Sequence, residues 1–99
     1  MYFAIYATDG PGAGQTRSDR FEDFRSYLHD HPGHPDIVLH HAGQTLAEED
    51  DTIVGSLLVV EAPSLEAAHA FVADSPYGKA GVFGDVQVRR WNWITGRPG

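Results

Sequence analysis

Residues 53 to 60, Ile-Val-Gly-Ser-Leu-Leu-Val-Val, form an uncharged stretch rich in leucine and β-branched residues. This composition and length predict a β-strand. Because successive side chains of a strand point to opposite faces of its sheet, the adjacent residues Leu57 and Leu58 place apolar groups on both faces. The run from Ile37 to Leu39 repeats the pattern. The sequence therefore predicts a sheet that is covered on both sides.

Two segments between the apolar runs have helical periodicity. The first follows Arg17, and Pro32-Gly33 ends it. Its apolar residues recur three and four positions apart, at Phe21, Phe24, Tyr27 and Leu28. The second covers residues 65–73, and Ser64 directly before it is a typical N-cap. Two amphipathic helices are therefore expected.

The remaining segments complete the order of elements. Strands are predicted at residues 2–7, 37–42, 53–60 and 85–94. The acidic segment 47–51 is expected to be a solvated hairpin connection, and residues 75–78 a turn. The resulting β-α-β-β-α-β order predicts a ferredoxin-like α+β fold, in which two helices cover one face of a four-stranded antiparallel sheet.

This arrangement leaves the second apolar face of the sheet without a cover. A domain of this size buries only about 60–65% of the surface of its extended chain, so further burial would stabilise it. We therefore predict a homodimer in which two sheets pack face to face into a barrel-like core. Trp91 and Trp93 share a face of the last predicted strand and are expected at this interface; stacking on an aromatic ligand is the alternative.

Composition excludes several classes of function. The chain has 99 residues, enough for one domain, and a formal net charge of −7 with scattered basic residues, which argues against a nucleic-acid partner. It has no cysteine, so disulfides and thiolate chemistry are excluded. The apolar amino end, residues 1–8, is too short to span a membrane and lacks the features of a signal peptide. We expect a cytoplasmic protein without a membrane partner.

Six segments together resemble one known family, the YCII-related proteins, over nearly the whole chain. The segments are Tyr2 to Ala7 with Asp9, Ala42-Gly43, Gly55 to Glu61, Ser64 to Ala68, Ser75 to Tyr77 with Lys79 to Val82, and Arg90 to Trp93. The resemblance implies a single domain over residues 1–99 that forms a dimeric α+β barrel. One branch of the family acts in the breakdown of chlorinated aromatics, where a member eliminates chloride from a chlorinated hydroxyquinol.

The family site that the resemblance implies is altered in this chain. Family members carry a His on the first helix and an Asp directly before the Pro-Tyr pair, which are taken as an acid–base dyad. Here Arg20 stands at the position of that His and Ser75 at the position of that Asp, while Asp74 lies one residue earlier. Gln44 replaces the proline that follows Ala42-Gly43 in the family. The intact dyad is therefore not expected.

Histidine is the usual proton-transfer group near neutral pH, and the chain has six. Since Arg20 cannot exchange a proton in this range, His31 or His41 paired with Asp74 is the predicted acid–base pair. Adjacent His40 and His41 would point to opposite faces of their strand unless the strand is bulged. The structural alternatives are a turn for Asp74 and, for His31, a solvated helix end.

A metal site on the same histidines is a further alternative. His29, His31 and His34 are spaced by two and three residues across a proline, which does not place them on one helical face. A site built on them would also need rigidly held carboxylates. We therefore predict neither a metal ion nor another cofactor.

Four residues are candidates for substrate binding. Arg17 and Arg20 begin the first predicted helix, where a cation opposes the helix dipole, so they either bind an anionic substrate or pair with nearby carboxylates. Ser75 can hydrogen-bond a ligand, and the Tyr77 phenol can hold a substrate hydroxyl or oxyanion. The structural alternative for Tyr77 is a packing aromatic.

The leading hypothesis is a cofactor-independent enzyme of the lyase or isomerase type. It would transfer protons on a small hydroxylated aromatic or enolic catabolite, with or without chlorine, by dehydrochlorination or isomerisation. The first alternative is a binding or structural domain that keeps the family fold without catalysis. A metal-dependent oxygenase on the same architecture is the second alternative.

Overall fold

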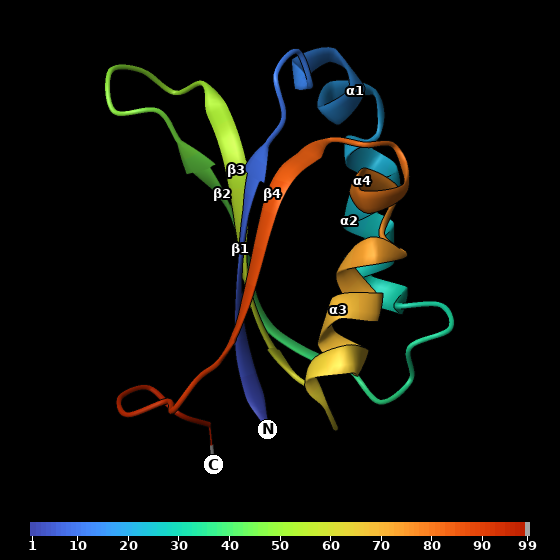
Figure 1. Cartoon of the computed structure of the whole chain (residues 1–99), viewed down its shortest axis with the longest axis vertical. Helices are drawn as coiled ribbons and strands as arrows, with labels where there is room; N and C mark the ends of the chain where they lie inside the picture. Colours follow the sequence, from blue (N-terminus) through green and yellow to red (C-terminus); the bar gives the residue numbers. More distant parts are fainter. Residues whose placement is uncertain (99) are drawn as a thin grey trace.

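The structure of the protein, a computed structural model, describes residues 1–98 and centres on one antiparallel sheet (Figure 1). Its strands are β1 (Tyr2–Asp9), β2 (Val38–Leu46), β3 (Ile53–Glu61) and β4 (Phe83–Arg90). Their order across the sheet is β2-β3-β1-β4, so β1 and β3 are the central strands. Sheet and strand order agree with the predicted ferredoxin-like α+β fold.

Four helical segments cover one face of this sheet. They are α1 (Gly14–Asp19), α2 (Phe21–Asp30), α3 (Leu65–Ala73) and α4 (Pro76–Lys79). Figure 1 shows all four on the same side of the strands. The apolar core lies between the two layers, and its fully buried side chains include Phe3, Ile5, Val60 and Phe71. The predicted two-layer arrangement is therefore present, and the opposite face of the sheet is uncovered.

Two helices begin at serine N-caps. The Ser64 hydroxyl accepts a hydrogen bond from the Ala67 N–H at 3.1 Å, which confirms the predicted start of α3. The Ser75 hydroxyl accepts from the Gly78 N–H at 3.1 Å and so starts α4. Each cap satisfies a backbone donor that the first helical turn leaves free.

The single helix predicted to begin at Arg17 is two helices in the structure, and the first of them already begins at Gly14. They meet at Arg20, whose backbone (φ −101°, ψ 5°) departs from helical geometry. The second of them, α2, ends at His31, which adopts the left-handed conformation (φ 36°, ψ 58°) immediately before the predicted stop at Pro32. The short helix α4 occupies the segment predicted as a turn.

Strand ends also differ from the prediction. β2 continues four residues beyond the predicted end at position 42, while β4 ends at Arg90 instead of residue 94. The Trp91 N–H still donates to the Tyr2 carbonyl at 3.0 Å, so the chain follows the edge of the sheet slightly beyond β4. Trp91 and Trp93 therefore lie in the segment that leaves the sheet.

A β-bulge in β2 places both adjacent histidines on the uncovered face. Leu39 lies opposite Val60, but His41 lies opposite Val59, so His40 is the extra residue. The rings of His40 and His41 both contact Trp93, with centroids 5.3 and 5.6 Å away. The bulge thus removes the alternation that a regular strand would impose on the two side chains.

The uncovered face carries exposed apolar side chains at its centre. Tyr6 of β1 and Leu57 of β3 lie opposite each other and are 48% and 44% exposed. None of the helices within residues 1–98 is long and apolar enough to cross a membrane.

Candidate functional site

Arg17 is a buried cation held by three elements. From α1 its guanidinium makes two hydrogen bonds to the Asp9 carboxylate at the end of β1, from Nε to Oδ2 at 2.6 Å and from Nη2 to Oδ1 at 2.8 Å. The two side chains are only 5% and 10% exposed. Nη2 also donates to the Ser56 hydroxyl of β3 at 2.9 Å. This two-point pairing fixes the guanidinium and leaves no uncompensated charge in the interior.

Tyr77 completes the surroundings of Arg17. Its fully buried ring lies beneath the guanidinium, with 4.6 Å from Cζ to the ring centroid, and its hydroxyl donates to the Arg17 carbonyl at 3.2 Å. The ring also stacks on Phe24 at 4.1 Å between centroids. Burial raises the pKa of the Tyr77 phenol, and the nearby guanidinium opposes that shift. Tyr77 is therefore neutral at physiological pH, and its proton is already donated to the backbone.

A cavity of about 270 Å³ opens beside this network, and we call it the Arg17 pocket. It lies between α1, α2 and α4 on one side and the strands β2 and β3 on the other. Its lining residues are Arg17, Phe21, Phe24, Arg25, Leu28, Ala42, Gly43, Gln44, Ser56, Leu58 and Tyr77. A second hollow of about 470 Å³ adjoins it and shares Arg17, Phe21 and Gln44. Aromatic and aliphatic walls with a few polar groups are typical of a site for a small organic molecule.

Ser56 supplies a hydrogen-bond donor to the Arg17 pocket. It is buried, lines the pocket, and accepts one bond from Arg17. Its hydroxyl makes no other hydrogen bond among residues 1–98, so its proton is available to a bound molecule. Accepting a bond from a cation makes a hydroxyl a stronger donor. The sequence analysis missed both Ser56 and Asp9; the available signal was a polar residue inside the apolar run 53–60.

Asp74 has a histidine partner, but neither of the two that were predicted. His34, in the connection between α2 and β2, places its Nε2 2.8 Å from the Asp74 carboxylate oxygen Oδ2. The His34 side chain is 12% exposed and packs edge-on against Tyr27 and Phe71. The Tyr27 hydroxyl donates to the Phe71 carbonyl at 2.6 Å. This His–Asp pair joins the loop after α2 to the end of α3, and neither member lines the Arg17 pocket.

The two predicted histidines lie elsewhere. His31 packs edge-on against Phe71, with 5.7 Å between ring centroids, and His41 packs on Trp93 at the uncovered face. Asp74 makes its hydrogen bond to neither of them.

The predicted binding residues divide into two groups. Arg17 and Tyr77 meet at the Arg17 pocket, as described above. Arg20 is exposed, outside the pocket, and its guanidinium lies 3.7 Å from the Asp23 carboxylate. Ser75 is buried, and its hydroxyl is used by the backbone: it donates to the Val72 carbonyl at 2.6 Å and caps α4. The structure thus places Arg20 and Ser75 in local structural roles.

The Arg17 pocket differs chemically from a metal site. Its polar lining consists of two guanidiniums, an amide and two hydroxyls, which are donors or weak ligands. Across residues 1–98, no three His, Asp or Glu side chains gather closely enough to hold a metal ion. The pocket is suited to binding and stabilising negative oxygen atoms.

The comparison with one solved structure agrees with this architecture. The chain is 35% identical to 5-chloro-2-hydroxyhydroquinone dehydrochlorinase (TftG) from Burkholderia phenoliruptrix AC1100, which was solved in complex with 2,5-dihydroxybenzoquinone. The match covers 93% of this chain and 94% of that chain, with a TM-score of 0.78. The Arabidopsis thaliana protein At3g17210 is 12% identical over 98% of both chains, with a TM-score of 0.49. None of the curated proteins compared with the chain matches it.

A sequence model of the YCII-related domain matches residues 1–92, which is nearly the whole chain. The fold, the extent of this match and the similarity to TftG all lead to one assignment, which confirms the predicted resemblance. The chain belongs to the YCII-related family.

Proposed function

We propose that the chain is a dehydrochlorinase-like enzyme that acts, without a cofactor, on a small hydroxylated and chlorinated aromatic in the Arg17 pocket. The similarity to TftG supports this activity, since that protein is named for such a reaction and holds an oxygen-substituted six-membered ring. At 35% identity over 93% of the chain, the likeness extends well beyond the fold.

The observation that carries the proposal is the combination of flat walls and polar donors in one small cavity. Phe21, Phe24 and Leu58 line the cavity and suit the faces of a single ring, and its volume of about 270 Å³ suits one ring rather than two. Arg17 and Ser56 reach the same cavity from α1 and β3 and suit the oxygen substituents. An aromatic ring with acidic hydroxyls matches both features.

The reaction needs little from the protein beyond charge stabilisation. Loss of HCl proceeds from a keto tautomer of the ring, in which a hydroxyl proton has moved to the carbon that bears chlorine. A second hydroxyl then gives its proton to the acceptor, and chloride departs with the electron pair of the carbon–chlorine bond as a quinone forms. Negative charge therefore builds on the ring oxygens before chloride departs, and the guanidinium and the polarised hydroxyl of Ser56 stabilise it. A cation beside a bound phenol also lowers its pKa, which favours the phenolate near neutral pH.

The proton acceptor is water in this proposal. Among residues 1–98, no imidazole or carboxylate lines the Arg17 pocket, and the Asp9 carboxylate already accepts two bonds from Arg17. The rival acceptor is the predicted pair of Asp74 with His31 or His41, although the histidine that lies within hydrogen-bond distance of Asp74 is His34.

Chloride release by the purified protein tests the proposal. Chlorinated hydroxyquinols and their unchlorinated counterparts are compared as substrates, and only the former should release chloride. Ser56→Ala should lower kcat/KM at least about tenfold because a donor to the developing oxyanion is lost. Ser26→Ala, on the exposed side of α2, is the control. Failure of every chlorinated aromatic to release chloride would contradict the proposal.

Asp74→Asn decides between the two proton acceptors. An unchanged rate removes Asp74 from the mechanism and favours water, whereas a large fall in kcat would contradict turnover in the Arg17 pocket, because neither His34 nor Asp74 lines it. The same variant leaves the Arg17 pocket intact, since Asp74 does not line it.

One observation favours a second candidate, a binding domain without catalysis. At the two positions of the family dyad, Arg20 is exposed beside Asp23 and Ser75 caps a helix, so neither can transfer a proton in the pocket. A domain of this kind would bind a hydroxylated aromatic at the Arg17 pocket and release it unchanged. Calorimetric binding of an unchlorinated hydroxyquinol, with no chloride release from its chlorinated form, would favour this candidate.

We also propose that a second copy of the chain covers the uncovered face of the sheet. The exposed pair of Tyr6 and Leu57 at the centre of that face supports a homodimer.

A further inference from the structure

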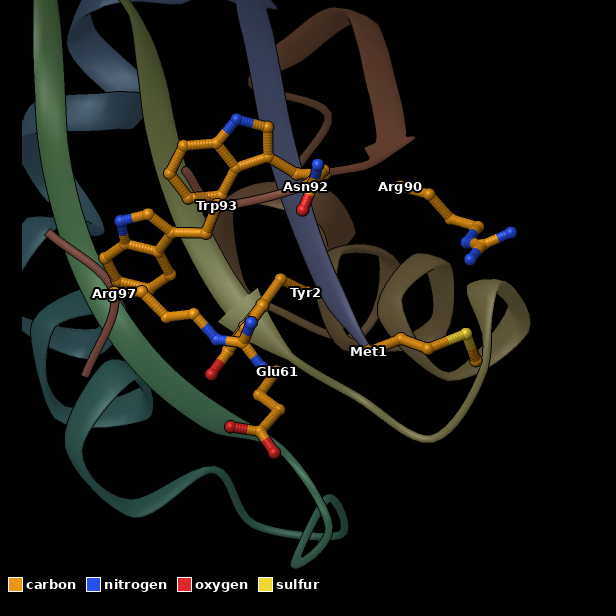
Figure 2. Close-up of a pocket in the computed structure, with 8 residues that line it drawn as sticks. Met1, Tyr2, Glu61, Arg90, Asn92, Trp93 and Arg97 are labelled. Carbon is orange, nitrogen blue, oxygen red and sulfur yellow. The ribbon is translucent and has the colours of Figure 1, made fainter. Parts of the chain in front are cut away.

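A second cavity, of about 550 Å³, lies at the end of the sheet where the chain leaves β4, and we call it the sheet-end pocket (Figure 2). Its lining includes Tyr2, Glu61, Arg90, Trp91, Trp93 and Arg97. It shares no lining residue with the Arg17 pocket. Its volume lies within the usual range for sites that bind small organic molecules.

Aromatic rings form one wall of the sheet-end pocket. Trp91 stacks on Trp93 with 4.9 Å between centroids, and Tyr2 meets Trp93 edge-on at 5.2 Å. Trp93 is almost fully buried, and its indole N–H donates to the Thr95 carbonyl at 2.6 Å. These contacts fix the rings before any ligand arrives, so a planar molecule can stack on Tyr2 and Trp91 with little loss of side-chain freedom.

Free cations form the rest of the site. The Arg97 guanidinium lies over the Tyr2 ring, 5.5 Å from its centroid, and Figure 2 shows the end of its side chain next to Tyr2. Within residues 1–98, neither Arg97 nor Arg90 makes a salt bridge. The lining carboxylate, Glu61, is paired with His40, with 3.3 Å from Oε1 to Nε2. A locally positive site therefore exists on a chain whose net charge is −7.

We propose that the sheet-end pocket binds a small aromatic carboxylate, with its ring on Tyr2 and Trp91 and its carboxylate on Arg97. A planar guanidinium donates two parallel hydrogen bonds to a carboxylate, and an aromatic wall favours a ring over an aliphatic group. The site is separate from the proposed catalytic pocket. Tyr2 lies on the same face of β1 as Tyr6, so the site borders the proposed dimer interface, but its lining includes the charged residues Glu61, Arg90 and Arg97.

Intrinsic fluorescence provides a readout of this site alone. Trp91 and Trp93 are the only tryptophans in the chain, so excitation of tryptophan reports on the sheet-end pocket and not on the Arg17 pocket. The probe is benzoate, and its controls are benzamide, which lacks the charge, and cyclohexanecarboxylate, which lacks the aromatic ring. Benzoate should change the emission in a saturable way, and each control compound should need at least about a tenfold higher concentration.

Two arginine variants test the role of the guanidinium. Arg97→Ala should weaken benzoate binding about tenfold or more, because it removes the bidentate partner of the carboxylate. Arg89→Ala removes an equal charge from β4 but does not touch the pocket, so it should leave the midpoint within about twofold. Arg97 lies in the exposed terminal segment, so its replacement should not affect folding.

Three results would overturn the proposal. They are a non-saturating emission change with benzoate, equal midpoints for benzoate and benzamide, and equal midpoints for the two variants. Chloride release plays no part in this assay, so its outcome is independent of the proposed enzyme activity.

Discussion

At the residue scale, Arg17 shows how one side chain serves stability and the candidate site together. Its bonds to Asp9 and Ser56 join α1 to β1 and β3 in the interior. We expect Arg17→Met to lower the free energy of unfolding by about 3–5 kcal/mol, since the Asp9 carboxylate would be left buried and unpaired. Urea denaturation measures this loss. Arg20→Met, at an exposed position, should change stability by less than about 0.5 kcal/mol, and equal losses would contradict the buried pair.

The Tyr27 phenol predicts a dependence of stability on alkaline pH. Burial, with a contribution from the Asp74 charge, raises the pKa of Tyr27 to about 12 from its ordinary value of 10.0. The folded state therefore holds this proton more tightly than the unfolded state. Its contribution to stability is fully present below pH 10 and is lost as pH rises through about 12.

Tyr27→Phe provides the measurement for that pH dependence. The variant should be less stable at neutral pH because the bond to the Phe71 carbonyl is lost. Its free energy of unfolding should also fall less steeply than that of the wild type between pH 10 and 12. Parallel curves for the two proteins over this range would exclude Tyr27 as the titrating group.

Long sequence separations explain which contacts of the candidate site could not be predicted from the sequence. Arg17 was found because a cation opposes the dipole in the first turn of the predicted helix, although the structure places it in the last turn of α1. Tyr77 was found because its phenol can hold a substrate oxygen. The His34–Asp74 contact joins residues 40 positions apart, and only the packed connection after α2 brings them together. Ser56 was missed because its neighbours in the strand are apolar, and its partner Arg17 is 39 positions away.

At the element scale, the short helix α4 positions Tyr77 and Ser75. Gly78 lies so close to the end of α3 that a Cβ atom there would overlap the Val72 carbonyl oxygen. We expect Gly78→Ala to lower the free energy of unfolding by about 1–3 kcal/mol, because backbone would have to move. Thermal or urea denaturation measures the change.

Gly14→Ala is the matched control for the α4 variant. Gly14 begins α1, and a Cβ atom there meets nothing within 4 Å. Alanine should therefore be neutral or stabilise the protein by a few tenths of a kcal/mol, since it restricts the unfolded chain. A loss at Gly14 as large as that at Gly78 would show that crowding at α4 is not the cause.

Element order was predictable because it follows from apolar periodicity and capping residues. The strand 53–60 and the helix 65–73 with its Ser64 cap agree closely with β3 and α3. The break at Arg20 and the helix α4 were not predicted, because both are single-turn features that depend on how α2 and α3 pack. A bulge was considered only as the way in which His40 and His41 could share a face. Its presence could not be predicted, because the register of β2 depends on the neighbouring strand.

At the scale of the whole molecule, the uncovered sheet face predicts self-association. A two-fold symmetric dimer would bring the same face of both copies together, so one substitution acts twice. Leu57→Glu, at the centre of the face, should shift the protein to monomers in analytical ultracentrifugation by placing charges in an apolar interface. Ala70→Glu adds the same charge on an exposed part of α3 and should leave the dimer intact. A wild-type protein that sediments as a monomer at high concentration would exclude the interface.

The bulge in β2 has a consequence for how the length of this strand can vary. His40 shifts the alternation of side chains along β2 by one residue. Leu39 and Ala42 are three residues apart and therefore both lie on the helix-covered side, opposite Val60 and Leu58. Deleting His40 would leave one residue opposite Val59 and restore a regular pleat, with Leu39 and Ala42 still on the helix-covered side. Deleting Leu39 would instead place His40 opposite Val60 and turn its polar ring toward the core. Loss of His40 should therefore be tolerated far better than loss of the adjacent Leu39, although each deletion shortens β2 by one residue.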